Sequence, residues 1–333
     1  MSGRSGAIGA LFGLAIGDAL GMPTQLMSRQ AIADRYGSIE WFEPAADDHP
    51  LARGMAAASI TDDTEQALLL ARLLVEGAGH VDPESFAHAL VRWEDSMRAR
   101  GSLDLLGPST KRAVDAVIAG EPATESGRFG TTNGAAMRVT PVGIAVDTTD
   151  LEALVDRVVE SCLASHNTGV AIAAASAVAG AVSAGIDGAE SRVAFDTAIA
   201  AAELGAARGY WVAAADVAAR IRLAIDLAEP ADPERSLTRI YEVIGTSLAS
   251  QESVPAAFGV LATFPDDPWS AVRAAAALGG DSDTVAAMAG AIGGAIHGVD
   301  AYPVEARDTV ARVNHLELER VADGLLAVRA ALS

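Results

Sequence analysis

The sequence predicts an all-α protein, and three observations carry that prediction. Hydrophobic residues make up 50% of the 333 residues, aromatic residues only 5%, and alanine runs recur throughout. Apolar positions repeat at helical spacing, whereas the sequence has no convincing run of alternating β-branched residues that would indicate a strand. We therefore expect sixteen or so tightly packed helices in one compact domain over residues 1–333, without a clear linker or internal repeat.

The first expected helix covers residues 5–20. Four glycines lie about one turn apart along it: Gly6, Gly9, Gly13 and Gly17. That face has no side chains, so a neighbouring helix can approach closely, and packing must offset roughly 1 kcal/mol per glycine relative to alanine. Asp18 interrupts the apolar run and no convincing cleavage site follows, so we expect a mature helix rather than a signal peptide.

Later segments are assigned from the same spacing. Residues 38–58 have the composition of a loop that leads to an acidic cluster. The stretch 169–186 is long enough to span a membrane, but its small residues and lack of flanking basic residues favour a buried helix. Other helical patterns are expected at 65–76, 83–100, 109–119, 151–164, 189–204, 212–227, 234–247, 254–264, 269–278, 285–296, 303–314 and 315–332.

Charge and cysteine content limit the partners and the compartment. With 24 basic and 44 acidic residues, the net charge of −20 disfavours nucleic acid and anionic membrane surfaces as partners. Cys162 is the single cysteine, which excludes an internal disulfide and fits a reducing, cytoplasmic compartment. Because it lies in an apolar helical pattern, we expect a buried small side chain rather than a nucleophile.

Two acidic clusters far apart in the chain suggest a two-part metal site. One is Thr61-Asp62-Asp63-Thr64, and the other is Gly279-Gly280-Asp281-Ser282-Asp283-Thr284. Hard divalent cations prefer oxygen ligands, and four crowded aspartates would repel one another without cations. Either cluster alone is better explained as a helix cap. The near-mirror composition of the two clusters favours metal binding, with four negative charges to balance two divalent ions.

The loop 127–138 is rich in glycine and hydroxyl residues and opens a short helix. Backbone N–H groups at such a junction suit a phosphate or sugar oxygen. This pattern alone is typical of any loop, but Arg128 and Arg138 strengthen it because an acidic protein needs guanidinium groups to bind an anion. His166, at the start of another helix, either belongs to the capping loop or faces the same cleft, and the sequence leaves both open.

In chain order, these stretches resemble the ADP-ribosylglycohydrolases, which include the enzyme that reactivates dinitrogenase reductase. The matching segments keep the family's order and span nearly the whole chain. They are 9–23, 61–64 (TDDT), 107–114 (GPSTKRAV), 133–143 (NGAAMRVTPVG), 165–166 (SH) and 279–295. The resemblance implies an orthogonal helical bundle with two Mg²⁺ or Mn²⁺ ions in a cleft. It also implies hydrolysis of the bond between a ribose anomeric carbon and a leaving group.

The resemblance also assigns roles to individual residues. It implies metal ligands at Thr61, Asp62, Asp63, Asp281, Asp283 and Thr284. It implies substrate-binding residues at Gly130, Thr131, Thr132, Asn133, Gly134, Met137, Arg138 and His166. The ions would orient the ribose hydroxyls and lower the pKa of a water, and Asp62 or Asp63 could act as the base.

Gln25 departs from the family pattern. Many members have a glutamate here, in a sequence of the form G-x-P-x-E, and an amide can neither act as a base nor bind metal as well. We expect a hydrolase acting on an N- or O-glycosidic bond of a small ADP-ribosyl or ribosyl compound, or of an ADP-ribosylated protein, with Gln25 among the catalytic positions. The alternatives are a non-catalytic ADP-ribose- or nucleotide-binding protein, a small-nucleoside hydrolase and a purely structural helical protein.

Overall fold

The computed structural model describes residues 3–102 and 106–332, and this part of the chain is all-α. It contains eighteen α-helices, a π-helical segment and a 3₁₀ turn, and no strand within those residues. The helices are α1 (Gly3–Gly21), α2 (Arg29–Tyr36), α3 (Asp62–Glu76), α4 (Pro83–Ala99), α5 (Pro108–Ile118), α6 (Ala123–Ser126), α7 (Gly134–Met137), α8 (Thr140–Ala145), α9 (Leu151–Cys162), α10 (Gly169–Ile186), α11 (Ser191–Ala206), α12 (Val217–Asp226), α13 (Pro233–Arg239), η1 (Ile240–Ile244), α14 (Ser250–Thr263), α15 (Pro268–Ala276), α16 (Ser282–His297), η2 (Val299–Ala301), α17 (Val304–Asn314) and α18 (Leu318–Leu332). The predicted fold class is confirmed.

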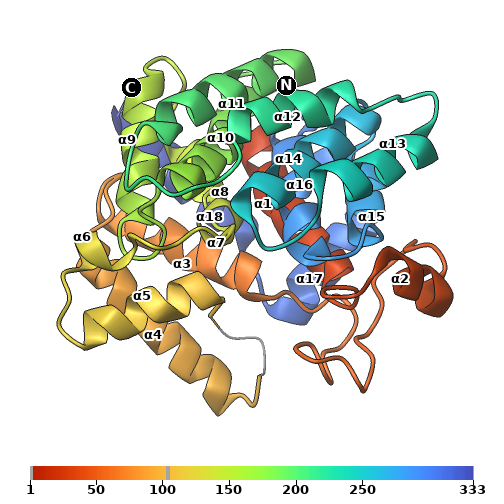
Figure 1. Cartoon of the computed structure of the whole chain (residues 1–333), viewed down its shortest axis with the longest axis horizontal. Coiled ribbons are helices and arrows are strands. Elements are labelled where there is room, and N and C mark those ends of the chain that lie inside the picture. The colour runs from red at the N-terminus through yellow and green to blue at the C-terminus, as the bar shows by residue number, and fades with distance from the viewer. Residues whose placement is uncertain (1–2, 103–105, 333) are drawn as a thin grey trace.

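Helices α1 and α16 pack against each other at the centre of the molecule, with α1 in red and α16 in blue (Figure 1). A Cβ on Gly9 would lie 2.3 Å from the carbonyl oxygen of Gly294, and a Cβ on Gly17 would lie 2.0 Å from that of Ala286. Side chains at these positions would therefore clash with the backbone of α16. The close approach that the glycine spacing predicted is confirmed.

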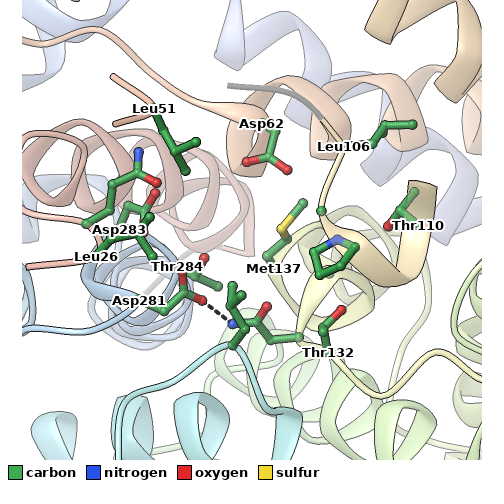
Figure 2. A pocket seen from close by; sticks show the side chains of 16 residues that line it. Leu26, Leu51, Asp62, Leu106, Thr110, Thr132, Met137, Asp281, Asp283 and Thr284 are labelled. Atoms are coloured by element: carbon green, nitrogen blue, oxygen red, sulfur yellow. Dashed lines mark hydrogen bonds between the residues drawn. The ribbon is translucent and has the colours of Figure 1, made fainter. Parts of the chain in front are cut away.

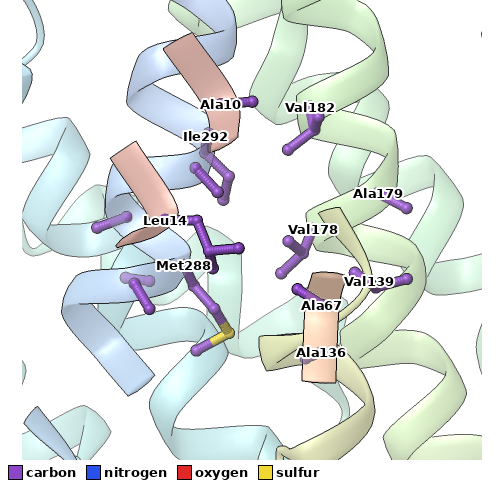
Figure 3. Packing of buried hydrophobic residues seen from close by; sticks show 14 of the residues in the cluster. Ala10, Leu14, Ala67, Ala136, Val139, Val178, Ala179, Val182, Met288 and Ile292 are labelled. Atoms are coloured by element: carbon purple, nitrogen blue, oxygen red, sulfur yellow. The ribbon is translucent and has the colours of Figure 1, made fainter. Parts of the chain in front are cut away.

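Helix α10 is buried along its whole length although it is apolar enough to cross a membrane. Figure 3 shows Val178 and Val182 of this helix facing Leu14 of α1 and Ile292 of α16 across the core. It is thus a core helix, as predicted. Cys162, at the end of α9, is also buried, and burial raises the pKa of its thiol to about 11.

Three short helices and some boundaries differ from the expected elements. Helices α2, α6 and α8 were not among the expected elements. Helix α2 buries only Ile32, so it carries no apolar stripe that would reveal it. Its ends are instead set by the Ser28 cap, which accepts from the N–H of Ala31, and by Gly37 at φ 69°. The helix expected from residue 212 begins at Val217, because Asp216 caps it by accepting from the N–H of Ala219.

Candidate active site

Both acidic clusters and part of the predicted substrate loop line one cavity of about 260 Å³ (Figure 2). Apolar side chains from separate segments, including Leu51 and Leu106, complete its wall. The predicted site residues that line it are Gln25, Asp62, Thr132, Asn133, Gly134, Met137, Asp281, Asp283 and Thr284. The fold therefore brings residues from both ends of the chain to one place.

The first cluster is held by a buried aspartate of α1 that the sequence analysis did not assign to the site. Asp18 accepts hydrogen bonds from the backbone N–H and hydroxyl groups of both Thr61 and Thr64. The hydroxyl of Thr64 lies 2.5 Å from Asp18 Oδ2, and that of Thr61 lies 2.8 Å from Oδ1. Asp18 thus fixes the loop and the first turn of α3 that carry Asp62 and Asp63. A charged residue inside an otherwise apolar helix was the sequence signal for such a role.

The second cluster begins at two glycines in the left-handed region. Gly279 has φ 88° and Gly280 has φ 75°, and a Cβ on Gly280 would lie 2.4 Å from the carbonyl oxygen of Thr246. This tight turn starts α16 at Ser282 and places Asp281 where the side-chain amide of Asn133 donates to it. The predicted substrate loop and the second acidic cluster are therefore in direct contact.

The two clusters also meet each other directly. The hydroxyl of Thr284 donates to Asp63 Oδ2 at 3.3 Å, and the other carboxylate oxygen of Asp63 is buried without a hydrogen-bond partner in the described part of the chain. Thr61 and Asp63 lie beneath the cavity wall, because neither is more than 1% exposed. Asp63 and Thr284 are 221 residues apart in the sequence, and the packing of α1, α3 and α16 brings them together.

Burial and mutual repulsion disfavour the ionised form of the carboxylates at this site when no cation is bound. Burial, followed by the charges of Asp283 and Asp62, holds the pKa of Asp63 well above its usual range. Burial also raises the pKa of Asp18 and that of Asp281 to about 6. A divalent cation would relieve this repulsion, and carboxylate and hydroxyl oxygens are the donors that Mg²⁺ and Mn²⁺ accept.

The acidic side chains are spread around the cavity rather than gathered at one point. Within residues 3–102 and 106–332, no three histidine, cysteine or acidic side chains converge into a metal-binding group. The oxygen donors nonetheless fit a divalent cation in kind, because Asp63 keeps an unsatisfied buried oxygen beside the threonine hydroxyls. The donor set is therefore compatible with metal binding, with water completing the coordination.

Gln25 lies on the cavity wall and is only 4% exposed. Its amide nitrogen is buried and has no hydrogen-bond partner among the described residues. Its backbone carbonyl is fixed by His49, whose Nδ1 accepts from the N–H groups of Leu51 and Ala52. Because Nδ1 accepts, Nε2 of the neutral ring carries the proton and donates to the Gln25 carbonyl at 3.0 Å. The loop 38–58 therefore meets the site through Leu51, which lines the cavity, and through His49, which holds Gln25.

Four predicted substrate-binding residues do not line the cavity. Gly130 and Thr131 lie before the lining segment of their loop, while Arg138 and His166 are completely buried behind it. Arg138 contacts Gln66 and Ser165, two residues that the sequence analysis did not assign to the site. In the described part of the chain, neither Arg138 nor His166 therefore reaches the cavity to contact a ligand directly.

The all-helical fold and the two acidic clusters that meet at one cavity are the features that the resemblance to the ADP-ribosylglycohydrolases implies. The profile of the ADP-ribosylglycohydrolase family matches residues 2–332, and the chain belongs to that family. The chain is similar to the uncharacterized protein YegU of Escherichia coli (strain K12), with 35% identity over 323 residues that cover 97% of this chain and 96% of that protein. It is 28% identical to the ADP-ribosylarginine hydrolase Tri1 of Pseudomonas putida (strain GB-1), over 93% of this chain and 76% of that protein. A solved structure described as an ADP-ribosylglycohydrolase-related protein complex shares the fold, with a TM-score of 0.71, 24% identity and coverage of 98% and 99%.

Proposed function

We propose that the protein is a divalent-metal-dependent hydrolase that cleaves the bond between a ribose anomeric carbon and its leaving group. The observation that carries the proposal is the meeting of the two acidic clusters at one cavity, joined by the hydrogen bond from Thr284 to Asp63. Membership of the ADP-ribosylglycohydrolase family supports the same reaction class. The substrate would be an ADP-ribosylated group or a related ribosyl compound.

Two Mg²⁺ or Mn²⁺ ions would be held by the two clusters, with Thr61, Asp62, Asp63, Asp281, Asp283 and Thr284 as ligands. When bound, they would supply positive charge that orients the ribose hydroxyls and makes a nearby water easier to deprotonate. Asp62 is the better candidate base, because it lines the cavity while Asp63 is buried beneath it. The remaining carboxylates would stabilise the positive charge that develops on the ribose ring.

The size of the cavity favours a ribosyl group as the part of the substrate that enters. A volume of about 260 Å³ lies just below the roughly 300–1,000 Å³ of sites that enclose a drug-sized ligand. The rest of an ADP-ribosyl substrate, or a modified protein, would then remain outside. Because Tri1 is named as an ADP-ribosylarginine hydrolase, an arginine linkage is the first to test. The single buried thiol supports a reducing, cytoplasmic setting.

The direct test is release of ribosyl product from ADP-ribosylarginine, ADP-ribosylserine and a panel of nucleosides, with Mg²⁺, Mn²⁺ or EDTA. We expect release from one substrate class with metal, and loss of that activity in Asp62→Asn and Asp283→Asn. The control is Asp196→Asn, which removes an equal charge from the exposed face of α11. Absence of product from every substrate with either metal would refute the hydrolase proposal.

One observation favours a second candidate function. The amide of Gln25, whose nitrogen has no hydrogen-bond partner in the described part of the chain, cannot accept a proton as the family glutamate would. A protein that binds ADP-ribose or a nucleotide without hydrolysing it would tolerate this amide, which can donate to a ligand oxygen. Tight, metal-dependent binding of ADP-ribose measured by calorimetry, together with no turnover of any linkage, would establish this alternative.

A further inference from the structure

A chain of hydrogen-bonded side chains, buried along its middle, connects the two walls of the cavity. It begins at Asp62, whose Oδ2 accepts from the amide nitrogen of Gln66 at 2.9 Å. The amide oxygen of Gln66 accepts from Arg138 at 2.9 Å. A guanidinium only donates and an ionised carboxylate only accepts, so the orientation of the Gln66 amide between them is fixed by chemistry. Gln66 and Arg138 are both fully buried.

On its other side, Arg138 determines the direction of a second set of hydrogen bonds. It donates to the hydroxyl oxygen of Ser165 at 2.5 Å, and that oxygen lies 2.9 Å from Nδ1 of His166. Ser165 is buried, and His166 Nδ1 is the acceptor beside its hydroxyl in the described part of the chain. Its proton therefore goes to Nδ1, because a buried hydroxyl without an acceptor would cost about 1–3 kcal/mol.

The tautomer of His166 follows from this direction. Burial, followed by the charge of Arg138, lowers the pKa of His166 well below its usual value, so the ring is neutral. With Nδ1 accepting, Nε2 carries the proton and donates to the hydroxyl oxygen of Thr132 at 3.0 Å. Thr132 lines the cavity, and its own hydroxyl proton has no acceptor among the described residues. That proton is therefore available to a ligand.

Arg138 is the one member of this chain with a permanent charge, and that charge is confined. The guanidinium is fully buried, its hydrogen-bond partners in the described part of the chain are the neutral side chains of Gln66 and Ser165, and its central carbon lies 4.9 Å from the centroid of the Phe86 ring. A buried cation held by neutral partners orients them strongly, because the local dielectric is low. Its neighbours cannot reverse their hydrogen bonds without opposing this charge.

We propose that Arg138 is a positioning residue that sets both walls of the cavity at once. Through Gln66 it orients the Asp62 carboxylate, and through Ser165 and His166 it makes the Thr132 hydroxyl a donor to the cavity. The ligand group opposite Thr132 must then be a hydrogen-bond acceptor, such as a ribose or phosphate oxygen. The Asp62 half of this inference rests on the proposed metal-dependent function, whereas the His166 half does not.

The experiment measures two quantities in the full-length protein: the ring ¹⁵N chemical shifts of His166, and Mn²⁺ affinity by calorimetry. The wild type is expected to show the Nε2–H tautomer, with the resonance assigned through His166→Gln. Arg138→Met should mix the tautomers and weaken Mn²⁺ binding about tenfold, as supporting residues around metal ligands do. Ser165→Ala should alter only the tautomer, and Gln66→Met should alter only the Mn²⁺ affinity.

The matched control is Arg329→Met. Arg329 is another buried arginine, but it donates to backbone carbonyls such as that of Val146 and to Asp187, and it does not line the cavity. Its loss should lower stability and leave both readouts unchanged. If Arg138→Met does not fold, Ser165→Ala and Gln66→Met test the proposal instead, because each interrupts the chain on one side of Arg138. An unchanged tautomer in Ser165→Ala together with unchanged Mn²⁺ affinity in Gln66→Met would overturn the proposal. A wild type that binds no Mn²⁺ would refute the metal-dependent function, and the tautomer measurement would still decide the role of Arg138.

Discussion

Gly13 and Gly290 face each other with no room for a side chain on either. A Cβ on Gly13 would lie 2.0 Å from the carbonyl oxygen of Gly290, and a Cβ on Gly290 would lie 2.0 Å from that of Gly13. The carbonyl of Gly290 also accepts from the hydroxyl of Tyr302 at 2.6 Å. The two helices therefore touch backbone to backbone, and the same pair of helices carries Asp18 and Asp283.

Replacing Gly13 with alanine should force α1 and α16 apart. We expect Gly13→Ala to lower the free energy of unfolding by about 1–3 kcal/mol or more, because neither backbone can yield as a side chain would. Chemical denaturation measures the change. Gly324→Ala is the matched control, because a Cβ there lies 3.4 Å from Val75 in ordinary contact. That control should be neutral or slightly stabilising, since alanine favours a helix; equal losses in both variants would contradict the prediction.

Asp18→Asn should loosen the first acidic cluster. The asparagine NH₂ group would face donors from Thr61 or Thr64 in place of an acceptor. Leaving such buried donors unsatisfied costs about 1–3 kcal/mol in stability, and Mn²⁺ affinity should fall with it because Asp62 and Asp63 follow Thr61. Thermal unfolding with and without Mn²⁺ measures both effects. Wild-type stability in Asp18→Asn would show that the hydrogen bonds to Asp18 do not hold the loop.

Gln25→Glu should have opposite effects with and without metal. Without a cation, a further carboxylate in the cavity that Asp62, Asp281 and Asp283 already line adds to the repulsion and should lower the melting temperature. With Mn²⁺, the same carboxylate is an additional oxygen ligand, so the increase in melting temperature on metal addition should exceed that of the wild type. Gln30→Glu, on the exposed surface of α2, is the control: it replaces a hydrogen bond to Asp34 with repulsion, so it should lower the melting temperature slightly and leave the metal-induced increase unchanged. A smaller metal-induced increase than in the wild type would place Gln25 away from the ions.

His166 should make the protein less stable in mild acid. Its pKa is lowered in the folded protein, so below about pH 6.5 the unfolded chain binds the proton that the folded one excludes. Stability is then fully present above pH 6.5 and falls by about 1 kcal/mol per pH unit as the pH decreases. Asp18 and Asp281 act in the opposite direction, since their raised pKa values near 6 favour the folded state at low pH. The free energy of unfolding of the wild type and of His166→Gln, measured in metal-free buffer at pH 5.5 and 7.5, isolates the contribution of the histidine. An equal loss of stability between the two pH values in both proteins would contradict the prediction.

The sequence was sufficient where a residue's role depends on its neighbours in the chain. The glycines of α1 and the apolar length of α10 predicted their packing. The two acidic clusters predicted a shared site although they are 221 residues apart, because their compositions match. It was insufficient for Asp18, because its partners Thr61 and Thr64 lie more than forty residues away, at separations of 43 and 46. Arg138 is a sharper case: an arginine in a polar loop suggests a phosphate contact, but tertiary packing buries it against Gln66, Ser165 and Phe86.

The contact between α1 and α16 also determines when the site can exist during synthesis. Helix α1 ends at Gly21 and α16 begins at Ser282, so nearly the whole chain is made before the glycine face of α1 finds its partner. Contacts this distant in sequence slow folding and leave apolar surface exposed in the meantime. A nascent chain that stops before residue 282 would therefore present an unpaired α1 to chaperones and proteases, and would lack half of its acidic cavity.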